Sequence, residues 1–183
     1  GPQQEKMKLL NNMRSILSKW RNFLLAEALD AYEDNGQITL YHYSKADKPS
    51  LALDPDRFLE HNAYTRNDFN ASSLPRIFFY VNLDHAEPIV KEGATLYTTK
   101  VRTSDIYDMR SDELGLKQKA MRYPGIPASI DFDWMLRSIA GAIPENWSSK
   151  SILPEGASPY KGAYYTLSNM DVVVWFDQIE VTK

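Results

Sequence analysis

Apolar side chains recur every three or four residues from Met7 to about Glu33, and this stretch constrains the fold more than any other part of the sequence. The apolar positions are Leu9, Leu10, Met13, Ile16, Leu17, Trp20, Phe23, Leu24 and Ala28. Basic residues lie mostly between them, so the spacing predicts one long amphipathic helix or two short ones. We expect this helix to pack on one flank of a sheet, as Trp20 on the apolar side favours. The same pattern is also typical of a partner-binding or membrane-surface helix.

Short runs of β-forming residues follow the helix. Asp34, Asn35 and Gly36 are expected to end it, with Gly36 in the left-handed cap, and a first strand begins at about Gln37. Further strands are predicted at residues 76–83, 94–101, 162–167 and 172–181. Short helices are predicted at residues 54–60, 84–93, 104–120 and 131–140, with a long polar loop at 61–75. The pattern therefore predicts an α+β fold.

The length of 183 residues fits one compact domain. We divide the chain into an N-terminal helical segment, residues 1–36, and a domain, residues 37–183; Gly1-Pro2 is typical of the remnant of a cleaved expression tag. The formal net charge of −3 gives no general attraction for a phosphate backbone, so nucleic acid is not an expected partner. Cysteine, a membrane-spanning apolar run and an opening signal segment are all absent from the sequence, which predicts a cytoplasmic protein with no membrane partner.

Common catalytic and metal-binding motifs are missing from the sequence. His42, His61 and His85 are the only histidines, and none stands two or four residues from another. Pairs of imidazoles at such spacings are typical of metal sites, and cysteine ligands are absent, so no metal is expected. The phosphate-binding loops GxGxxG and GxxxxGK[ST] do not occur, nor does the GxSxG turn of serine hydrolases. The common nucleotide-binding and hydrolase folds are therefore unsupported.

What remains is a set of chemically capable residues spread over the predicted strands. His42 lies between two tyrosines at the end of the first strand, where a strand delivers a side chain to a cleft. Phe78, Phe79 and Tyr80 lie on the second strand, and Asp171 stands immediately before the last one. Each residue also has an ordinary structural explanation, as a histidine bonded through its ring nitrogens or as turn chemistry before a strand.

The order of four segments, YHYS, RIFFYVNLDHAEPIV, LYTTKV and GAYYTLSNMDVVVWFDQIEV, resembles the ADP-ribosyltransferase superfamily, especially its divergent phage-encoded and toxin-like members. In that family a Tyr-His pair ends the first strand, an aromatic strand and a short helix follow, and an acidic residue precedes a late strand. The resemblance covers about residues 38–181. It implies a split β-sheet core, preceded here by the amphipathic helix.

The activity that this resemblance implies is transfer of ADP-ribose from NAD⁺ to a protein, with release of nicotinamide. Asp171 would stabilise the positive charge that develops on the ribose, and His42 would orient the dinucleotide. Tyr80 would stack on the nicotinamide ring. The residues implied in binding NAD⁺ are Tyr41, Tyr43, Arg66, Arg76, Phe79 and Tyr97. The two arginines would hold the pyrophosphate through bidentate contacts.

Three functions fit these residues. A mono-ADP-ribosyltransferase would modify a host or self protein, in the cytoplasm of a host cell or from a virion. An NAD⁺ glycohydrolase would use the same site with water as the acceptor. A catalytically degenerate member of the fold would serve as a phage structural or protein-binding module, with the N-terminal helix as its docking element. The family usually carries glutamate where this chain has Asp171, whose side chain is one methylene shorter.

Overall fold

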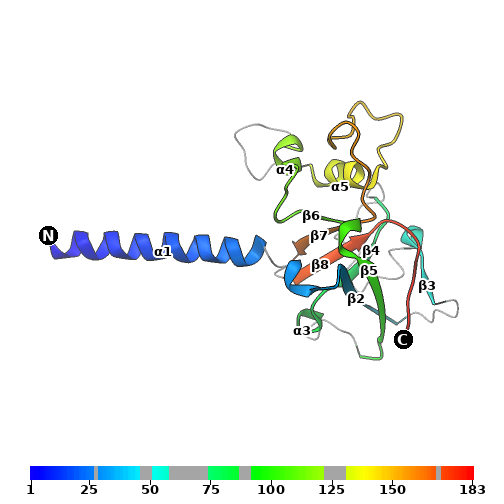
Figure 1. Cartoon of the computed structure of the whole chain (residues 1–183), viewed down its shortest axis with the longest axis horizontal. Coiled ribbons are helices and arrows are strands. Elements are labelled where there is room, and N and C mark those ends of the chain that lie inside the picture. Colours follow the sequence, from blue (N-terminus) through cyan, green and yellow to red (C-terminus); the bar gives the residue numbers. More distant parts are fainter. Residues whose placement is uncertain (27–28, 46–50, 58–73, 87–91, 122–130, 168–169) are drawn as a thin grey trace.

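The computed structural model describes residues 1–26, 29–45, 51–57, 74–86, 92–121, 131–167 and 170–183. Over these residues it contains helices and a curled mixed sheet, so the predicted α+β class is confirmed (Figure 1). Helix α1 (Pro2–Ala26) extends away from the body of the molecule that the sheet and the shorter elements form (Figure 1).

The main sheet has the strand order β1-β2-β4-β8-β7-β6, and β5 pairs with the other side of β2. Its strands are β1 (Glu33–Asp34), β2 (Gln37–Ser44), β4 (Ile77–Tyr80), β5 (Thr95–Arg102), β6 (Ile106–Asp108), β7 (Gly162–Leu167) and β8 (Met170–Trp175). A second sheet pairs β3 (Ala52–Leu53) with β9 (Ile179–Glu180). All pairs in the main sheet are antiparallel except β6 with β7, which is parallel. Strands β2, β4 and β8 are thus consecutive neighbours at its centre.

The sheet separates two apolar cores. One core contains Phe78, Tyr80 and Val172 and is covered by α5 (Phe132–Ala140) and α4 (Leu116–Lys119). The other contains Leu40 and Phe79, together with Leu29 from the segment before β1 and Val181 from the segment after β9. Because successive side chains of a strand point to opposite faces, neighbouring residues such as Phe79 and Tyr80 belong to different cores. The remaining short elements are α3 (Leu83–Ala86), η1 (Asp30–Tyr32), η2 (Pro55–Arg57) and η5 (Thr103–Asp105).

The prediction that Asp34, Asn35 and Gly36 end the long helix is wrong. Helix α1 ends at Ala26, and Asn35-Gly36 instead forms the turn of a β-hairpin between β1 and β2. Both turn residues have positive φ, 51° for Asn35 and 74° for Gly36, and two-residue hairpin turns that match the twist of the strands require this conformation. The Asn-Gly pair was therefore a hairpin signal.

Two more boundaries were predicted wrongly. Residues 104–120 do not form one helix, because Ile106–Asp108 is drawn into the sheet as β6 by parallel pairing with β7. Residues 172–181 do not form one strand, because the chain leaves the main sheet after Trp175 and β9 pairs with β3. The strand at 162–167 and the helix near 131–140 are confirmed. The predicted loop 61–75 lies almost wholly outside the described residues.

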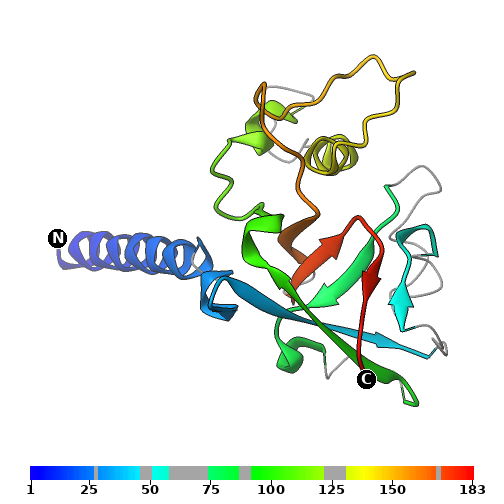
Figure 2. The same ribbon diagram turned by 45° about the vertical axis from the view of Figure 1, so that its right-hand side comes forward.

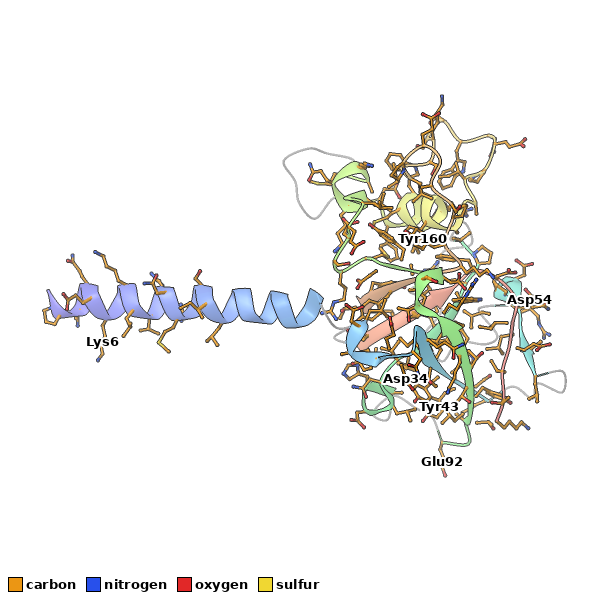
Figure 3. The ribbon with its side chains drawn as sticks, viewed as in Figure 1. Lys6, Asp34, Tyr43, Asp54, Glu92 and Tyr160 are labelled. Carbon is orange, nitrogen blue, oxygen red and sulfur yellow. The ribbon has the colours of Figure 1, made fainter. Side chains whose placement is uncertain are left out.

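The expectation that the long helix packs on a flank of the sheet is wrong for the side chains of α1 that the structure describes. Large apolar side chains from Met7 to Leu17 remain 47% to 65% exposed. Figure 3 shows the side chains around the labelled Lys6 pointing into open space, far from the body. The helical periodicity was correct, but the sequence pattern alone could not say whether the apolar face is covered by this chain.

Candidate functional site

Asp171 lies at the centre of a polar cluster at one end of β7 and β8. Its Oδ1 accepts hydrogen bonds from Arg110 Nη1 at 2.7 Å and from Thr166 Oγ1 at 3.2 Å. Its Oδ2 accepts a longer one, 3.4 Å, from the hydroxyl of Tyr32. The side chains of Asp171 and Arg110 are each 12% exposed, so this ion pair is largely shielded from solvent. Strand β8 starts at Met170, so Asp171 is inside the strand rather than before it.

Further hydrogen bonds join the polar cluster to the main sheet. The same Nη1 of Arg110 donates to the hydroxyl of Tyr164 at 3.1 Å, and the backbone amide of Arg110 donates to Asp108 at 2.8 Å. Burial raises the pKa of Tyr164, so its hydroxyl keeps its proton at neutral pH. The backbone amide of Asp171 donates to Nδ1 of His85 at 3.3 Å. Most hydrogen-bonding capacity of the carboxylate is therefore used within the protein.

His42 is a buried residue of β2 and does not line a cleft. It is 2% exposed, and its Nδ1 donates to the carbonyl oxygen of Phe78 at 2.7 Å. Its ring packs against Phe79, with a centroid distance of 5.6 Å. Tyr97 lies directly opposite His42 on β5 and is 1% exposed. The expectation that the strand delivers this histidine to an open cleft is thus wrong, because the apolar core closes over it.

His42 and Asp171 share a face of the sheet but do not meet. Strand β4 lies between β2 and β8, and the register aligns His42 with Phe79 and Val173. Asp171 is two residues further along β8. From standard sheet spacings, the two residues stand about 10 Å apart across the strands and about 7 Å along them. A ligand would have to span this distance over buried apolar side chains.

The other residues that the resemblance implied are divided between the two faces. Phe79 and Tyr97 lie on the face of His42, whereas Tyr80, Tyr41 and Tyr43 face the opposite core. Tyr80 therefore cannot join His42 and Asp171 in one site, because adjacent residues of a strand point to opposite faces. Arg66 lies outside the described residues.

Arg76 is buried beside the core that contains Phe78. It is 6% exposed, its Nη1 donates to the carbonyl oxygen of Leu74 at 2.9 Å, and its guanidinium lies 5.3 Å from the centre of the Phe78 ring. Burial lowers its pKa, and the nearby hydroxyl of Tyr165 opposes this shift. The guanidinium is held by the fold rather than presented to solvent, where a pyrophosphate would approach.

Tyr165 gives a testable pH dependence. Burial raises the pKa of this tyrosine to about 12, from an ordinary value of about 10. Between these two pKa values the hydroxyl of Tyr165 is protonated in the native state and ionised in the unfolded state. The stability that this difference contributes is therefore complete below about pH 10 and is lost as pH rises towards 12. Expressed as free energy, the loss is roughly 2–3 kcal/mol.

We expect Tyr165→Phe to flatten the fall in stability over this pH range. Urea denaturation at several pH values, followed by tryptophan fluorescence, measures the effect. An equally steep fall in wild type and variant would contradict the assignment to Tyr165.

Sequence reasoning missed the partners of Asp171. Arg110 was placed inside a predicted helix, and Tyr32 and Tyr164 were not singled out. The contacts join positions 61 and 139 residues apart, for Arg110 and Tyr32 respectively. No local pattern in the sequence reports such pairings, so only the fold brings these residues together.

No protein-family model, curated protein sequence or solved structure matches this chain. Within the described ranges, no three histidine and carboxylate side chains are placed together as a set of metal ligands. In the same part of the chain, no helix combines the length and the hydropathy needed to cross a bilayer. The structure therefore defines a class only broadly: an α+β body with a part-buried ion-pair cluster and an exposed amphipathic helix.

Proposed function

We propose that the chain is a protein-binding module that docks on its partner through α1. The observation that carries this proposal is the exposed apolar face of the helix. Met7, Leu9, Leu10, Met13, Ile16 and Leu17 are each between 47% and 65% exposed. Large contiguous apolar patches are uncommon on the surface of a soluble monomer and usually mark an interaction site. A helix with such a face gains most of its stability from packing on another surface.

The spacing of these residues favours a helical partner. Leu9 and Leu10 are followed seven residues later by Ile16 and Leu17, with Met13 between them, and the sequence repeats the pattern at Trp20, Phe23 and Leu24. On an α-helix these positions form one stripe more than about 100° wide. A strict seven-residue repeat keeps the stripe facing a partner helix, and three apolar positions per repeat suit a groove between two helices better than a single one.

The charge of α1 indicates which residues surround the groove of the partner. Residues 2–26 contain five basic residues and one acidic residue, a net charge of +4. Since the whole chain carries −3, residues 27–183 carry −7. Two copies of α1 side by side would repel each other, whereas a groove rimmed by carboxylates would attract the helix and orient it. The partner proposed is therefore an acidic helical protein rather than a second α1.

Site-specific photo-crosslinking tests this proposal. A photoreactive amino acid at Met13 lies on the apolar stripe, and the same group at Ser15 lies on the opposite side of the helix as the matched control. We expect adducts with one protein from position 13 and few from position 15, in the cells that make the protein. Equal adducts from both positions, or adducts confined to lipid, would contradict docking on a protein.

A second candidate function is ADP-ribosyl transfer or NAD⁺ hydrolysis. It is favoured by the strand order, since β2 with Tyr41-His42, the aromatic β4 and the acid-bearing β8 are neighbours in the sheet. His42 and Asp171 also share one face. However, the described residues do not form an open NAD⁺ site, because His42, Phe79 and Tyr97 are at most 2% exposed and Arg110 holds Asp171. We therefore derive no catalytic step from them.

Turnover of NAD⁺ separates this candidate from docking. Nicotinamide release and labelling of protein by adenine-labelled NAD⁺ are measured together, with Asp171→Asn as the control because asparagine preserves the shape of the side chain. We expect no turnover above background in either protein. Nicotinamide release that disappears in Asp171→Asn would establish an enzyme and would overturn docking as the principal function.

A further inference from the structure

We propose that the groove between β5 and β9 binds an extended segment of a partner protein as an added β-strand. The groove has a volume of about 1010 Å³ and lies where these two strands diverge. In Figures 1 and 2, β5 in green and the C-terminal segment in red approach near the C-terminus and separate away from it. This inference is independent of docking through α1, because none of the groove residues belongs to the helix.

Among the described residues, backbone bonds join β5 to the C-terminal segment at a single point, Thr182, which lies just after β9. The amide of Thr98 donates to the carbonyl of Thr182 at 2.8 Å, and the amide of Thr182 donates back to Thr98 at 2.9 Å. No backbone bond joins β5 to β9 itself among the described residues. The ladder that begins at Thr98 and Thr182 is therefore left open towards Arg102.

The register shows which backbone groups face the groove. In an antiparallel ladder, alternate residues of a strand direct their amide and carbonyl groups to opposite neighbours. The backbone amide and carbonyl of Thr98 bond to Thr182. The backbone amide and carbonyl of Lys100, two residues further along β5, therefore also point away from β2. On the other side, the amide of Val181 donates to the carbonyl of Leu51, just before β3, so the backbone groups of Glu180 are directed towards β5. Continuing the Thr98–Thr182 register places Lys100 opposite Glu180 across the gap.

The side chains along the groove specify the character of the added strand. Val101 and Val181 are buried on the inner side, and Trp175 and Ile179 line the groove there. The outer side presents charged residues of both signs, including Lys100 and Glu180. A strand places successive side chains on opposite faces, so the fitting segment alternates apolar with polar residues. Backbone bonds to an exposed strand edge supply affinity, and this alternation supplies selectivity.

Hydrogen exchange of individual amides tests the groove without any ligand. We expect the amides of Lys100 and Glu180 to exchange at least 10-fold faster than those of Thr98 and Thr182, since only the latter pair is bonded across the strands. Addition of the peptide acetyl-Thr-Val-Thr-Val-Thr-amide at about 1 mM should slow the Lys100 and Glu180 amides at least threefold. Slow exchange of both amides in the free protein, or no slowing with the peptide, would overturn the proposal.

A pair of variants distinguishes backbone recognition from side-chain effects. Lys100→Pro removes the outward amide while leaving β2 pairing intact, because this amide points away from β2. Lys100→Ala removes the charge but keeps the amide. We expect the proline variant to lose the peptide effect and the alanine variant to keep it, with Glu180→Pro as the second test if Lys100→Pro does not fold. Equal responses from the proline and alanine variants would overturn strand addition.

Discussion

Replacement of Asp171 by alanine is expected to lower the free energy of unfolding by about 2–4 kcal/mol. The substitution leaves the guanidinium of Arg110 without a carboxylate partner, on a side chain that is only 12% exposed. It also removes the acceptor for Thr166 and Tyr32. Removing one partner of a buried ion pair costs more than the pair itself contributes, because the remaining charge stays desolvated. Urea denaturation followed by circular dichroism measures the change.

Two control variants show whether the loss comes from the pair. Asp171→Asn keeps a hydrogen-bond acceptor and the shape of the side chain, so a smaller loss of about 1–2 kcal/mol is expected. Asp171→Ala combined with Arg110→Ala should cost less than the sum of the two single substitutions, because the double variant leaves no unpaired charge. A loss below about 0.5 kcal/mol for Asp171→Ala would contradict a structural role and would favour a carboxylate available for ligands.

Charge placed on the apolar stripe of α1 should abolish docking. Leu10→Glu together with Leu17→Glu is expected to weaken partner binding about 100-fold or more, because two leucines lose roughly 1.5–3 kcal/mol each of burial and two carboxylates enter an apolar groove. Both leucines are exposed in the free chain, at 47% and 65%, so the stability of the body should not change. Affinity for the partner that crosslinking identifies is measured by titration calorimetry, and stability is measured by thermal unfolding.

The matched control places the same charges on the other side of the helix. Asn11→Glu together with Ser15→Glu adds two carboxylates at exposed positions away from the stripe. We expect a change in affinity of no more than about threefold, arising from the reduced net positive charge of the helix. Similar losses from the two double variants would show that charge, rather than the apolar stripe, determines binding.

The elements that the sequence predicted well are those whose signal is local. Helix α5 carries its own cap, with the Asp131 side chain accepting from the amide of Trp134 and Gly141 in the left-handed conformation. Strands β5 and β7 are β-rich runs bounded by turn residues, and their predicted limits differ little from those observed. In contrast, β6 depends on pairing with β7, more than fifty residues later, and its own sequence reads equally well as helix.

The candidate site was less predictable than the fold. His42 was correctly placed on a strand and Asp171 was placed one residue before the strand that contains it. A strand, however, does not reveal which of its side chains will be covered by another part of the chain. The burial of His42 depends on Tyr97 from β5 and Phe79 from β4. The neutralisation of Asp171 depends on Arg110, which follows β6. For α1, periodicity defined the apolar stripe, yet the same stripe serves packing within a chain and docking on a partner.

Hydrogen exchange of the chain, measured with and without the partner that crosslinking identifies, tests docking through α1 most directly. Exchange of the segment from Leu9 to Leu17 is expected to slow at least 10-fold in the complex, because an isolated exposed helix opens readily and a docked helix does not. The amides of β2, β4 and β8 should be unchanged. Slowing confined to these strands, with α1 exchanging as in the free chain, would show that the partner binds the sheet and would contradict docking through the helix.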